Sequence, residues 1–338
     1  MNKALLALTI LSSSLPLMAR EIMCEQCECE PEPCCPEHLF VERSQWYVSA
    51  EFLYWTAESD AMDYAVRSSE TPPDSAVFAT GDYKTADYDW SPGFRVGLTY
   101  YRCPKYWEAS AEYTWLYAKG SDSTSSDFVR PTRLTNAFGP FDSATSSIYL
   151  HYHVGDLYAA RVFDPNPHLR LRVLGGLSTA YIQQDWKIHY TNAQDVSEKV
   201  QEKWRYFGGG VRMGVRADWF WGCQFYLTGK TTFATMIGTY KNEEIQTRPS
   251  TGATFGNAKY DDHRFAMNAQ FLLGPSWQIP CDCWSFELLA AYEFNIWLNL
   301  HERIRSYPST FNDDSTETYF ARGLFGTHGL TLRLNLGF

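Results

Sequence analysis

Alternation of apolar and polar residues with a period of two is the feature that most restricts how this chain can fold. In residues 46–55, one face of an extended strand carries Trp46, Val48, Ala50, Phe52 and Tyr54, and the other face is mixed. The same alternation recurs in nine further segments, namely 94–101, 109–115, 148–154, 169–173, 211–218, 225–230, 264–273, 286–298 and 330–338. The sequence therefore predicts an all-β protein.

The composition indicates that these strands cross a membrane. Strands of soluble sandwiches commonly have about five or six residues, whereas a tilted membrane-crossing strand needs about ten. Aromatic residues make up 16% of the chain, yet the mean hydropathy is only −0.35, too low for a bundle of membrane helices. A net charge of −10 excludes a nucleic-acid partner. Tryptophans lie near the expected strand ends, as the aromatic girdles of a barrel in lipid require: Trp46, Trp55, Trp90, Trp107, Trp115, Trp204, Trp219, Trp277, Trp284 and Trp297.

The connections between the strands alternate in length, which predicts the topology. Long polar connections cover about 57–89, 118–147, 188–203, 240–262 and 301–319, and short ones cover 103–105, 164–168, 220–222 and 280–283. Long outer loops and short periplasmic turns are typical of antiparallel up-and-down barrels of the bacterial outer membrane. We expect a transmembrane β-barrel over residues 45–338. It has ten strands, or twelve if the first or second long connection contains a weak hairpin.

The first 44 residues carry export signals rather than a core. Residues 1–19 read as a signal peptide, with Lys3 before a short apolar stretch, and residues 20–44 form an arm rich in Cys, Glu and Pro. The expected topology places all nine cysteines on the periplasmic side, and an exported protein favours disulfides: Cys24, Cys27, Cys29, Cys34, Cys35, Cys103, Cys223, Cys281 and Cys283. A metal site at Cys24 and Cys27 is the alternative, but we expect neither a metal nor a cofactor.

The last strand carries a targeting pattern. Its alternating residues end in a terminal phenylalanine, and this resembles the signal read by the barrel insertion machinery: Leu332, Leu334, Leu336 and Phe338. We therefore expect that machinery and outer-membrane lipid as partners.

Two segments resemble a known family. Residues 46–55 (WYVSAEFLYW) and 91–100 (SPGFRVGLTY) are similar to the first two strands of the Legionella-type major outer membrane proteins, which include MOMP-like porins of chlamydia-related bacteria. The resemblance covers roughly residues 45–338 and implies a pore-forming outer-membrane barrel. The Cys-rich arm resembles what is found in chlamydial envelopes, where disulfide cross-links between proteins support the wall. This resemblance implies disulfides to neighbouring envelope proteins or to further copies of the chain.

If the apolar faces meet lipid, the opposite faces line a lumen. The pore-lining candidates are seven arginines and four glutamates: Glu51, Arg95, Glu112, Arg170, Arg172, Arg212, Arg216, Arg264, Glu287, Glu293 and Arg333. Glu108, Arg161 and Lys230 share these faces. The basic excess predicts a weak preference for anions, unless the Arg and Glu side chains merely pair inside a narrow barrel.

The expected function is passive diffusion of ions and small solutes, with a disulfide-linked role in the envelope. A structural protein or surface adhesin with a narrow or closed barrel is the alternative, because ten strands enclose little space. We expect no enzyme. His151 and His153 share an expected lumen face without a catalytic motif, and Gly208 to Gly210 indicate a bend or a close approach rather than a phosphate loop.

Overall fold

The computed structural model describes residues 44–68, 81–103, 105–134, 141–192, 196–222, 224–280, 284–308 and 316–338. The signal peptide and the arm, apart from Ser44, lie outside these residues and remain predictions. The strands are β1 (Gln45–Ser59), β2 (Asp63–Ser68), β3 (Asp82–Thr85), β4 (Ser91–Arg102), β5 (Trp107–Pro131), β6 (Phe141–Asn166), β7 (Leu169–Thr191), β8 (Ser197–Gly222), β9 (Phe225–Arg248), β10 (Ala253–Pro280), β11 (Ser285–Pro308) and β12 (Thr316–Gly337). Within this part of the chain, no helix has the length and apolar character that a membrane crossing requires.

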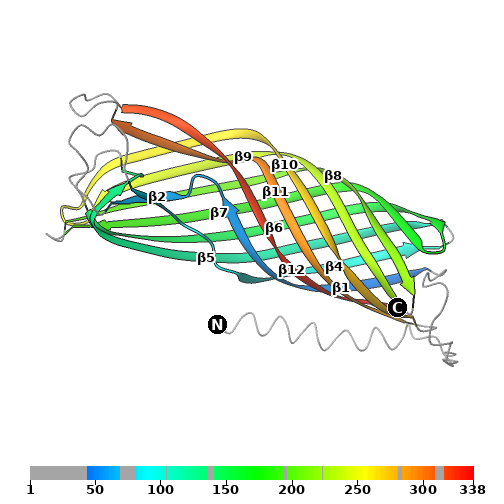
Figure 1. Ribbon diagram of the computed structural model, residues 1–338. Helices are drawn as coiled ribbons and strands as arrows, with labels where there is room; N and C mark the ends of the chain where they lie inside the picture. Colours follow the sequence, from blue (N-terminus) through cyan, green and yellow to red (C-terminus); the bar gives the residue numbers. More distant parts are fainter. Residues whose placement is uncertain are drawn as a thin grey trace, which may run out of the picture.

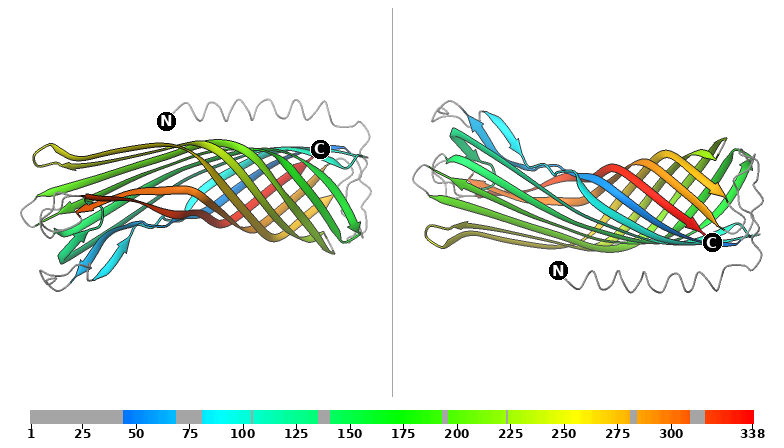
Figure 2. Two further views of the ribbon diagram at one scale, coloured as in Figure 1. Left: turned by 90° about the horizontal axis from the view of Figure 1, so that it is seen from above. Right: turned by 90° about the horizontal axis from the view of Figure 1, so that it is seen from below.

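Ten of the strands described close into a barrel (Figure 1). The antiparallel order is β4, β1, β12, β11, β10, β9, β8, β7, β6 and β5, and β5 pairs with both β4 and β6. The remaining two, β2 and β3, form a hairpin within the first long connection, and β2 pairs with the end of β5, where Ala65 faces Pro131. Figure 2 shows this hairpin at the end of the barrel opposite the C-terminus. The predicted barrel is confirmed, and the additional hairpin lies in one of the two connections where it was expected.

The strands are much longer than a membrane crossing requires. From β5 to β10 they have 25, 26, 23, 26, 24 and 28 residues, against the roughly ten that span an outer membrane. Most of the residues that the sequence assigned to the long connections after these strands therefore continue the sheet. On the other side, β6 and β7 are joined through the pair Asn166 and Leu169, which confirms one of the short turns.

The outer surface divides the barrel into two sections. Near the short turns the outward side chains are apolar, and the last of them include Tyr181 on β7, Phe207 on β8, Ile237 on β9 and Phe265 on β10. Ile237 is 69% exposed and Phe207 is 64% exposed, which suits contact with lipid. We call this part the membrane section. Beyond these residues the outward side chains are polar or charged, and we call that part the outer section.

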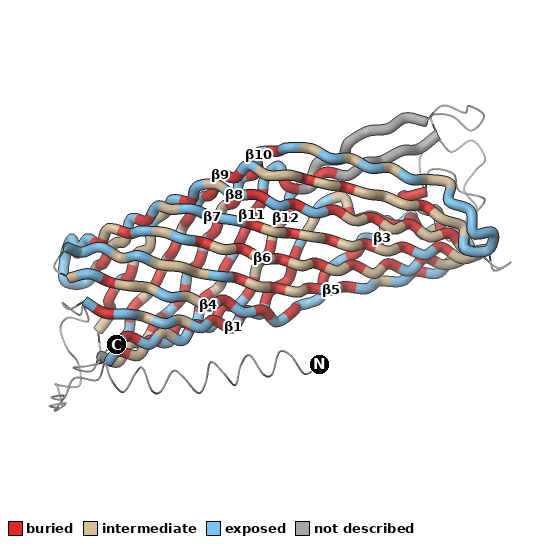
Figure 3. Tube along the Cα trace, turned by 180° about the vertical axis from the view of Figure 1, so that it is seen from behind, coloured by how far each residue is buried: buried red, intermediate tan, exposed pale blue. Residues whose placement is uncertain are grey.

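The polarity of the interior is reversed between the two sections. Buried and exposed residues alternate along most strands (Figure 3), and in the membrane section the buried ones are charged or polar, for example Arg95 and Glu293. In the outer section many of the buried side chains are apolar and form one large core, which includes Ile182, Trp204 and Phe325. A closed sheet allows this because each face of a strand can change character along its length.

This reversal corrects the predicted orientation of β6. The sequence assigned Ile148, Leu150 and Tyr152 to the lipid face and His151 and His153 to the lumen. These three apolar side chains are instead at most 2% exposed and lie in the core, and the two histidines point outward. The physical reason is that an apolar face signals lipid only within the membrane, whereas above it the apolar face packs inward.

Candidate functional site: the barrel interior

All eleven pore-lining candidates lie in the barrel interior, half-buried or buried. Glu51, Arg95, Glu112, Arg172, Arg212, Arg216, Glu287, Glu293 and Arg333 lie in the membrane section. The other two lie at its margins. Arg170 pairs with Asp164 at 2.8 Å near the short turns, and Arg264 pairs with Glu302 at 2.7 Å in the outer section.

The first group of charges joins four neighbouring strands. Arg95 on β4 binds Glu51 on β1 at 2.7 Å and Glu293 on β11 at 2.8 Å. Arg333 on β12 donates to the second oxygen of Glu51 at 2.6 Å. Thr331 also donates to Glu293, at 3.1 Å. Two cations and two carboxylates therefore balance each other in a site from which water is excluded.

A second group lies closer to the short turns. Arg216 on β8 binds Glu287 on β11 at 3.2 Å and Asp218 at 3.1 Å. Arg172 on β7 binds Glu108 on β5 at 2.9 Å and also contacts Asp218. The guanidinium groups of this group are thus held by carboxylates from several strands.

One ion pair crosses the lumen. The ammonium nitrogen of Lys230 on β9 lies 3.1 Å from a carboxylate oxygen of Glu112 on β5. Four pairing steps separate these strands by the shorter way around the ring, so the two side chains meet near its middle. Lys230 also lies over the ring of Tyr158, with its nitrogen 5.2 Å from the ring centroid.

Within the membrane section, the sequence analysis missed two interior carboxylates among the described residues. Asp156 on β6 binds Arg212 at 2.9 Å, and Asp218 binds Arg216 and Thr228. The sequence pattern could have identified both of them as interior residues. Asp218 continues the polar alternation of β8, and Asp156 continues a face that the sequence assigned to lipid, where a carboxylate is costly. With these two carboxylates added to the eleven candidates, the excess of basic charge falls to one, with seven arginines against six carboxylates.

Arg161 is a further correction. The sequence placed it with the lumen residues, but it lies on the outward face of β6 near the short turns. Its guanidinium lies over the ring of Trp107, 5.6 Å from the centroid. An arginine here can extend to the headgroup level while its stem covers an aromatic ring.

Aromatic contacts cross the lumen in the outer section. The rings of Tyr152 on β6 and Trp297 on β11, which are opposite strands of the ring, lie 6.3 Å apart between centroids. Trp204 on β8 lies 5.9 Å from Phe325 on β12, four strands away. All four side chains are at most 2% exposed. Aromatic rings from opposite sides of the barrel therefore meet in its interior at this level.

A single arginine closes the outer core. Arg133, which follows β5, lies 2.6 Å from Glu202 on β8 and 3.4 Å from Glu244 on β9, and it covers the ring of Trp186 at 5.2 Å. Burial opposes its charge, but the two carboxylates outweigh this and raise the pKa of Arg133 above its ordinary value. The group stays charged and holds three elements together.

A small cavity remains at the end with the short turns. Its volume is about 80 Å³, and its lining includes Tyr47, Glu108, Arg172, Asp218, Glu287 and Asn335. The lining is strongly charged and suits water or small ions. In the described residues no group of three His, Cys, Asp or Glu side chains could hold a metal ion.

Two other sets of candidates have different outcomes. Cys103 is the one cysteine among the described residues, and the other eight lie outside them, so the disulfide prediction stays a prediction. In the insertion signal, Leu332, Leu334, Leu336 and Phe338 are all exposed and point outward from β12 and its end. Their recognition by the insertion machinery remains an expectation.

The ring of strands, its apolar belt and its polar interior define a membrane-spanning β-barrel. The chain belongs to the family described as Legionella pneumophila major outer membrane protein precursor, whose model matches residues 40–332. This confirms the predicted family and the location in the bacterial outer membrane.

Other comparisons show more distant similarity. Comparison with curated proteins finds no significant match. Among solved structures, the chain is similar to the outer membrane protease OmpT from Escherichia coli, at 8% identity and a TM-score of 0.43, covering 93% of this chain and 99% of that one. It is also similar to the P. putida toluene transporter TodX, at 8% identity and a TM-score of 0.31, covering 88% and 90%. No activity is assigned to this chain on these similarities.

Proposed function

We propose that this outer-membrane protein is a closed barrel that serves as a structural element of the envelope and presents a rigid outer section at the cell surface. The observation that supports this best is the contact of interior side chains across the lumen at two levels. Lys230 meets Glu112 in the membrane section, and Tyr152 meets Trp297 in the outer section. This corresponds to the closed-barrel alternative that the sequence left open.

The two levels oppose permeation for different physical reasons. A hydrated ion entering the outer section would have to displace aromatic rings such as Trp204, which is completely buried. In the membrane section it would have to separate buried ion pairs such as that of Arg95 with Glu293, and each separation leaves an uncompensated charge. Both barriers would have to open together for passive diffusion.

Diffusion of small solutes is the second candidate function. The charged lining of the membrane section and the cavity of about 80 Å³ favour it, since a polar lumen is typical of channels. It requires that the aromatic contacts of the outer section separate. We also propose that the cysteines link the protein into the envelope through disulfides. Electrophoresis of isolated envelopes tests this, and we expect a high-mass ladder under non-reducing conditions that disappears under reducing conditions.

Recording from single molecules in planar bilayers tests the closed barrel. We expect the native protein to give no steady conductance steps. A fourfold variant, W204A/W297A/E112S/K230S, widens both levels without changing the net charge and is expected to conduct. The matched control W219A/W221A removes two tryptophans from the outer surface, where they are 58% and 64% exposed, and should behave as the native protein does.

The native recording decides even if the fourfold variant does not fold. Stable, ohmic steps from native protein at low voltage would overturn the proposal in favour of the diffusion pore. Conductance by W219A/W221A would also count against the proposal, because a barrel closed by its interior side chains should not open when outward tryptophans are removed.

A further inference from the structure

The outward face of the outer section carries a basic surface over β5 to β10. We define this basic wall by its cations, which are Lys119, Lys187, Lys199, Lys203, Arg205, Lys241 and Lys259. Among the described residues, four exposed or half-buried carboxylates accompany these cations, on Asp127, Asp185, Glu243 and Asp261. The wall therefore carries an excess of three positive charges in a chain whose net charge is −10.

The basic wall begins directly above the apolar belt. On β8, Arg205 is the first outward residue beyond the exposed Phe207, and two residues of a strand span about 6.6 Å. On β9, Lys241 is the second outward residue beyond Ile237. These cations consequently lie within about 15 Å of the hydrocarbon boundary, as measured along the strands.

The cations of the wall are only partly compensated. Lys203 binds Asp185 at 3.5 Å, Lys241 binds Asp261 at 3.3 Å and Lys259 binds Glu243 at 2.7 Å. The other four, Lys119, Lys187, Lys199 and Arg205, form no ion pair within the described residues. Four of the seven cations are thus available to an external anion.

Like charges stand directly opposite each other in this wall. Arg205 on β8 is the cross-strand neighbour of Lys241 on β9, and His189 on β7 is the neighbour of Lys199 on β8. Partial burial, and then the charges of Lys199 and Lys187, lower the pKa of His189. The lowered pKa leaves His189 neutral at neutral pH, so the like-charge pair is that of Arg205 and Lys241, which is unfavourable in isolation and would be relieved by an anion bound between the two side chains.

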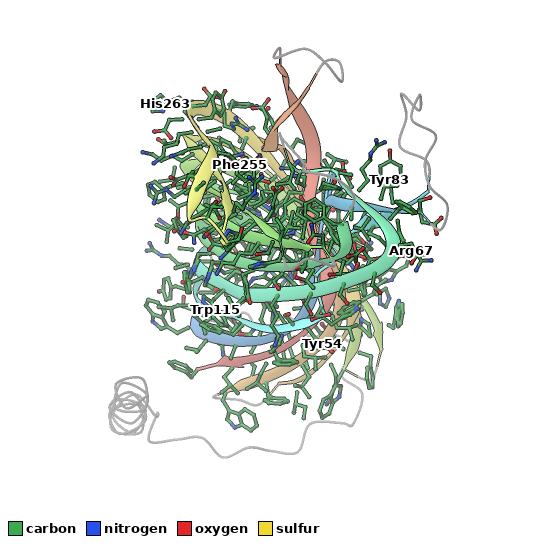
Figure 4. The ribbon with its side chains drawn as sticks, turned by 90° about the vertical axis from the view of Figure 1, so that its left-hand side faces the viewer. Tyr54, Arg67, Tyr83, Trp115, Phe255 and His263 are labelled. Carbon is green, nitrogen blue, oxygen red and sulfur yellow. The ribbon has the colours of Figure 1, made fainter. Side chains whose placement is uncertain are left out.

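Acidic residues occupy the other side of the outer section. Glu58, Asp60, Asp82, Asp87 and Asp89 are all exposed, on or beside β1 and β3. Figure 4 views the molecule from this end and shows His263 and Trp115 on the side opposite Tyr83 and Arg67. Acidic residues thus gather around β1 and β3, and they reach the edge of the basic wall where the backbone of Asp89 bonds that of Lys119.

We propose that the basic wall binds phosphorylated headgroups of lipids in the outer leaflet. The position favours a lipid over other anions, because lipid surrounds the belt and its phosphates lie at the height where the cations begin. Guanidinium and ammonium groups on neighbouring strands can share one phosphate, as Arg205 and Lys241 would. This inference does not depend on whether the lumen is closed.

Binding of a lipid A-type diphosphoryl glycolipid to the full mature protein tests the inference. The protein is refolded in zwitterionic micelles, and the apparent dissociation constant is taken from the rise in thermal midpoint with added lipid. We expect R205Q/K241Q to weaken binding about 30-fold, because each cation near a phosphate surface contributes about one factor of five. The matched control R67Q/K84Q removes one arginine and one lysine from the acidic side and should bind as the native protein does.

Stability without lipid separates a binding role from a structural one. R205Q/K241Q removes a repulsive pair together with the exposed ion pair of Lys241 with Asp261, which are small effects of opposite sign, so its thermal midpoint in lipid-free micelles should lie close to that of the native protein. Equal lipid affinity in both variants and the native protein would overturn the inference. An equal shift with inorganic phosphate, or with the dephosphorylated lipid, would also overturn it. Sedimentation provides a last check. If the native protein self-associates and the main effect of R205Q/K241Q is to abolish that association, the wall binds a second copy of the chain and the inference is overturned.

Discussion

Individual charges inside the membrane section are held by balance rather than by solvent. Arg95 is 4% exposed, and both of the carboxylates it binds, on Glu51 and Glu293, are also buried. Removing one partner of such a group leaves an uncompensated charge in a medium of low dielectric constant. Removing the charges of Arg95 and Glu293 together leaves the ion pair of Arg333 with Glu51 intact.

The first prediction follows from this balance. R95M should lower the free energy of unfolding by about 3–5 kcal/mol, and R95M/E293Q should lower it less because the remaining charges are matched. Urea titration of refolded protein, followed by tryptophan fluorescence, measures both variants. A double variant as unstable as the sum of its two single variants would contradict the matched-charge account.

Asp87 provides a prediction about pH at the same scale. Partial burial, followed by the charges of Asp122 and Glu58, raises the pKa of this exposed carboxyl in the outer section. The folded state therefore binds the proton more tightly than the unfolded state, and ionisation of Asp87 destabilises the fold as pH rises through that pKa. D87N should raise the thermal midpoint at about pH 7 and leave it unchanged at about pH 3, where carboxyls are mostly protonated.

A matched variant isolates the effect of Asp87. D127N removes a carboxylate from the outer part of β5, where no ion pair is present in the described structure, and should change the midpoint less than D87N at neutral pH. A lower midpoint for D87N than for the native protein at about pH 7 would show that the carboxylate is favourable where it stands.

At the scale of elements, strands twice the length of a membrane crossing need places where the sheet can bend. Gly210 on β8 meets a different requirement, a close approach between strands, because a Cβ added there would lie 1.9 Å from the carbonyl oxygen of Thr235 on β9. The close approach that the sequence indicated for residues 208–210 is confirmed at this position. At Gly209 the nearest atoms would be 3.7 Å away, so the two adjacent glycines have different constraints.

The element-scale prediction compares these two glycines. G210A should destabilise the barrel by about 1–3 kcal/mol, since β8 and β9 must separate to admit the methyl group. G209A is the control and should change stability little, because its methyl group meets only ordinary contacts. The urea midpoints of the two variants test this, and equal midpoints would contradict a close approach of β9 that excludes a side chain at Gly210.

The whole molecule combines two cores of opposite polarity in one sheet. Lipid around the membrane section leaves the interior as the polar side, and water around the outer section leaves the interior as the apolar side. The conductance predicted for the closed barrel and the lipid affinity predicted for the basic wall both belong to this scale. The first depends on both cores being filled, and the second depends on charges meeting lipid where the two sections join.

The sequence alone determined the class of the fold. Ten alternating segments, a weakly polar mean hydropathy and a terminal Phe338 were sufficient for an outer-membrane barrel, because side chains alternate locally and need no tertiary information. It also identified most of the interior charges, since charged residues within a membrane strand must face inward. The likeness of residues 46–55 and 91–100 to a known family was confirmed by the family match.

Only the tertiary structure decided which face of a strand points inward above the membrane and what the interior side chains meet. Ile148 and Leu150 look the same in sequence whether they face lipid or a core, because alternation specifies two faces but not the medium that each one contacts. The pair of Lys230 and Glu112 joins residues 118 positions apart, and that of Arg95 and Glu293 joins residues 198 apart. Such contacts follow from the closure and stagger of the whole ring, which no local pattern encodes.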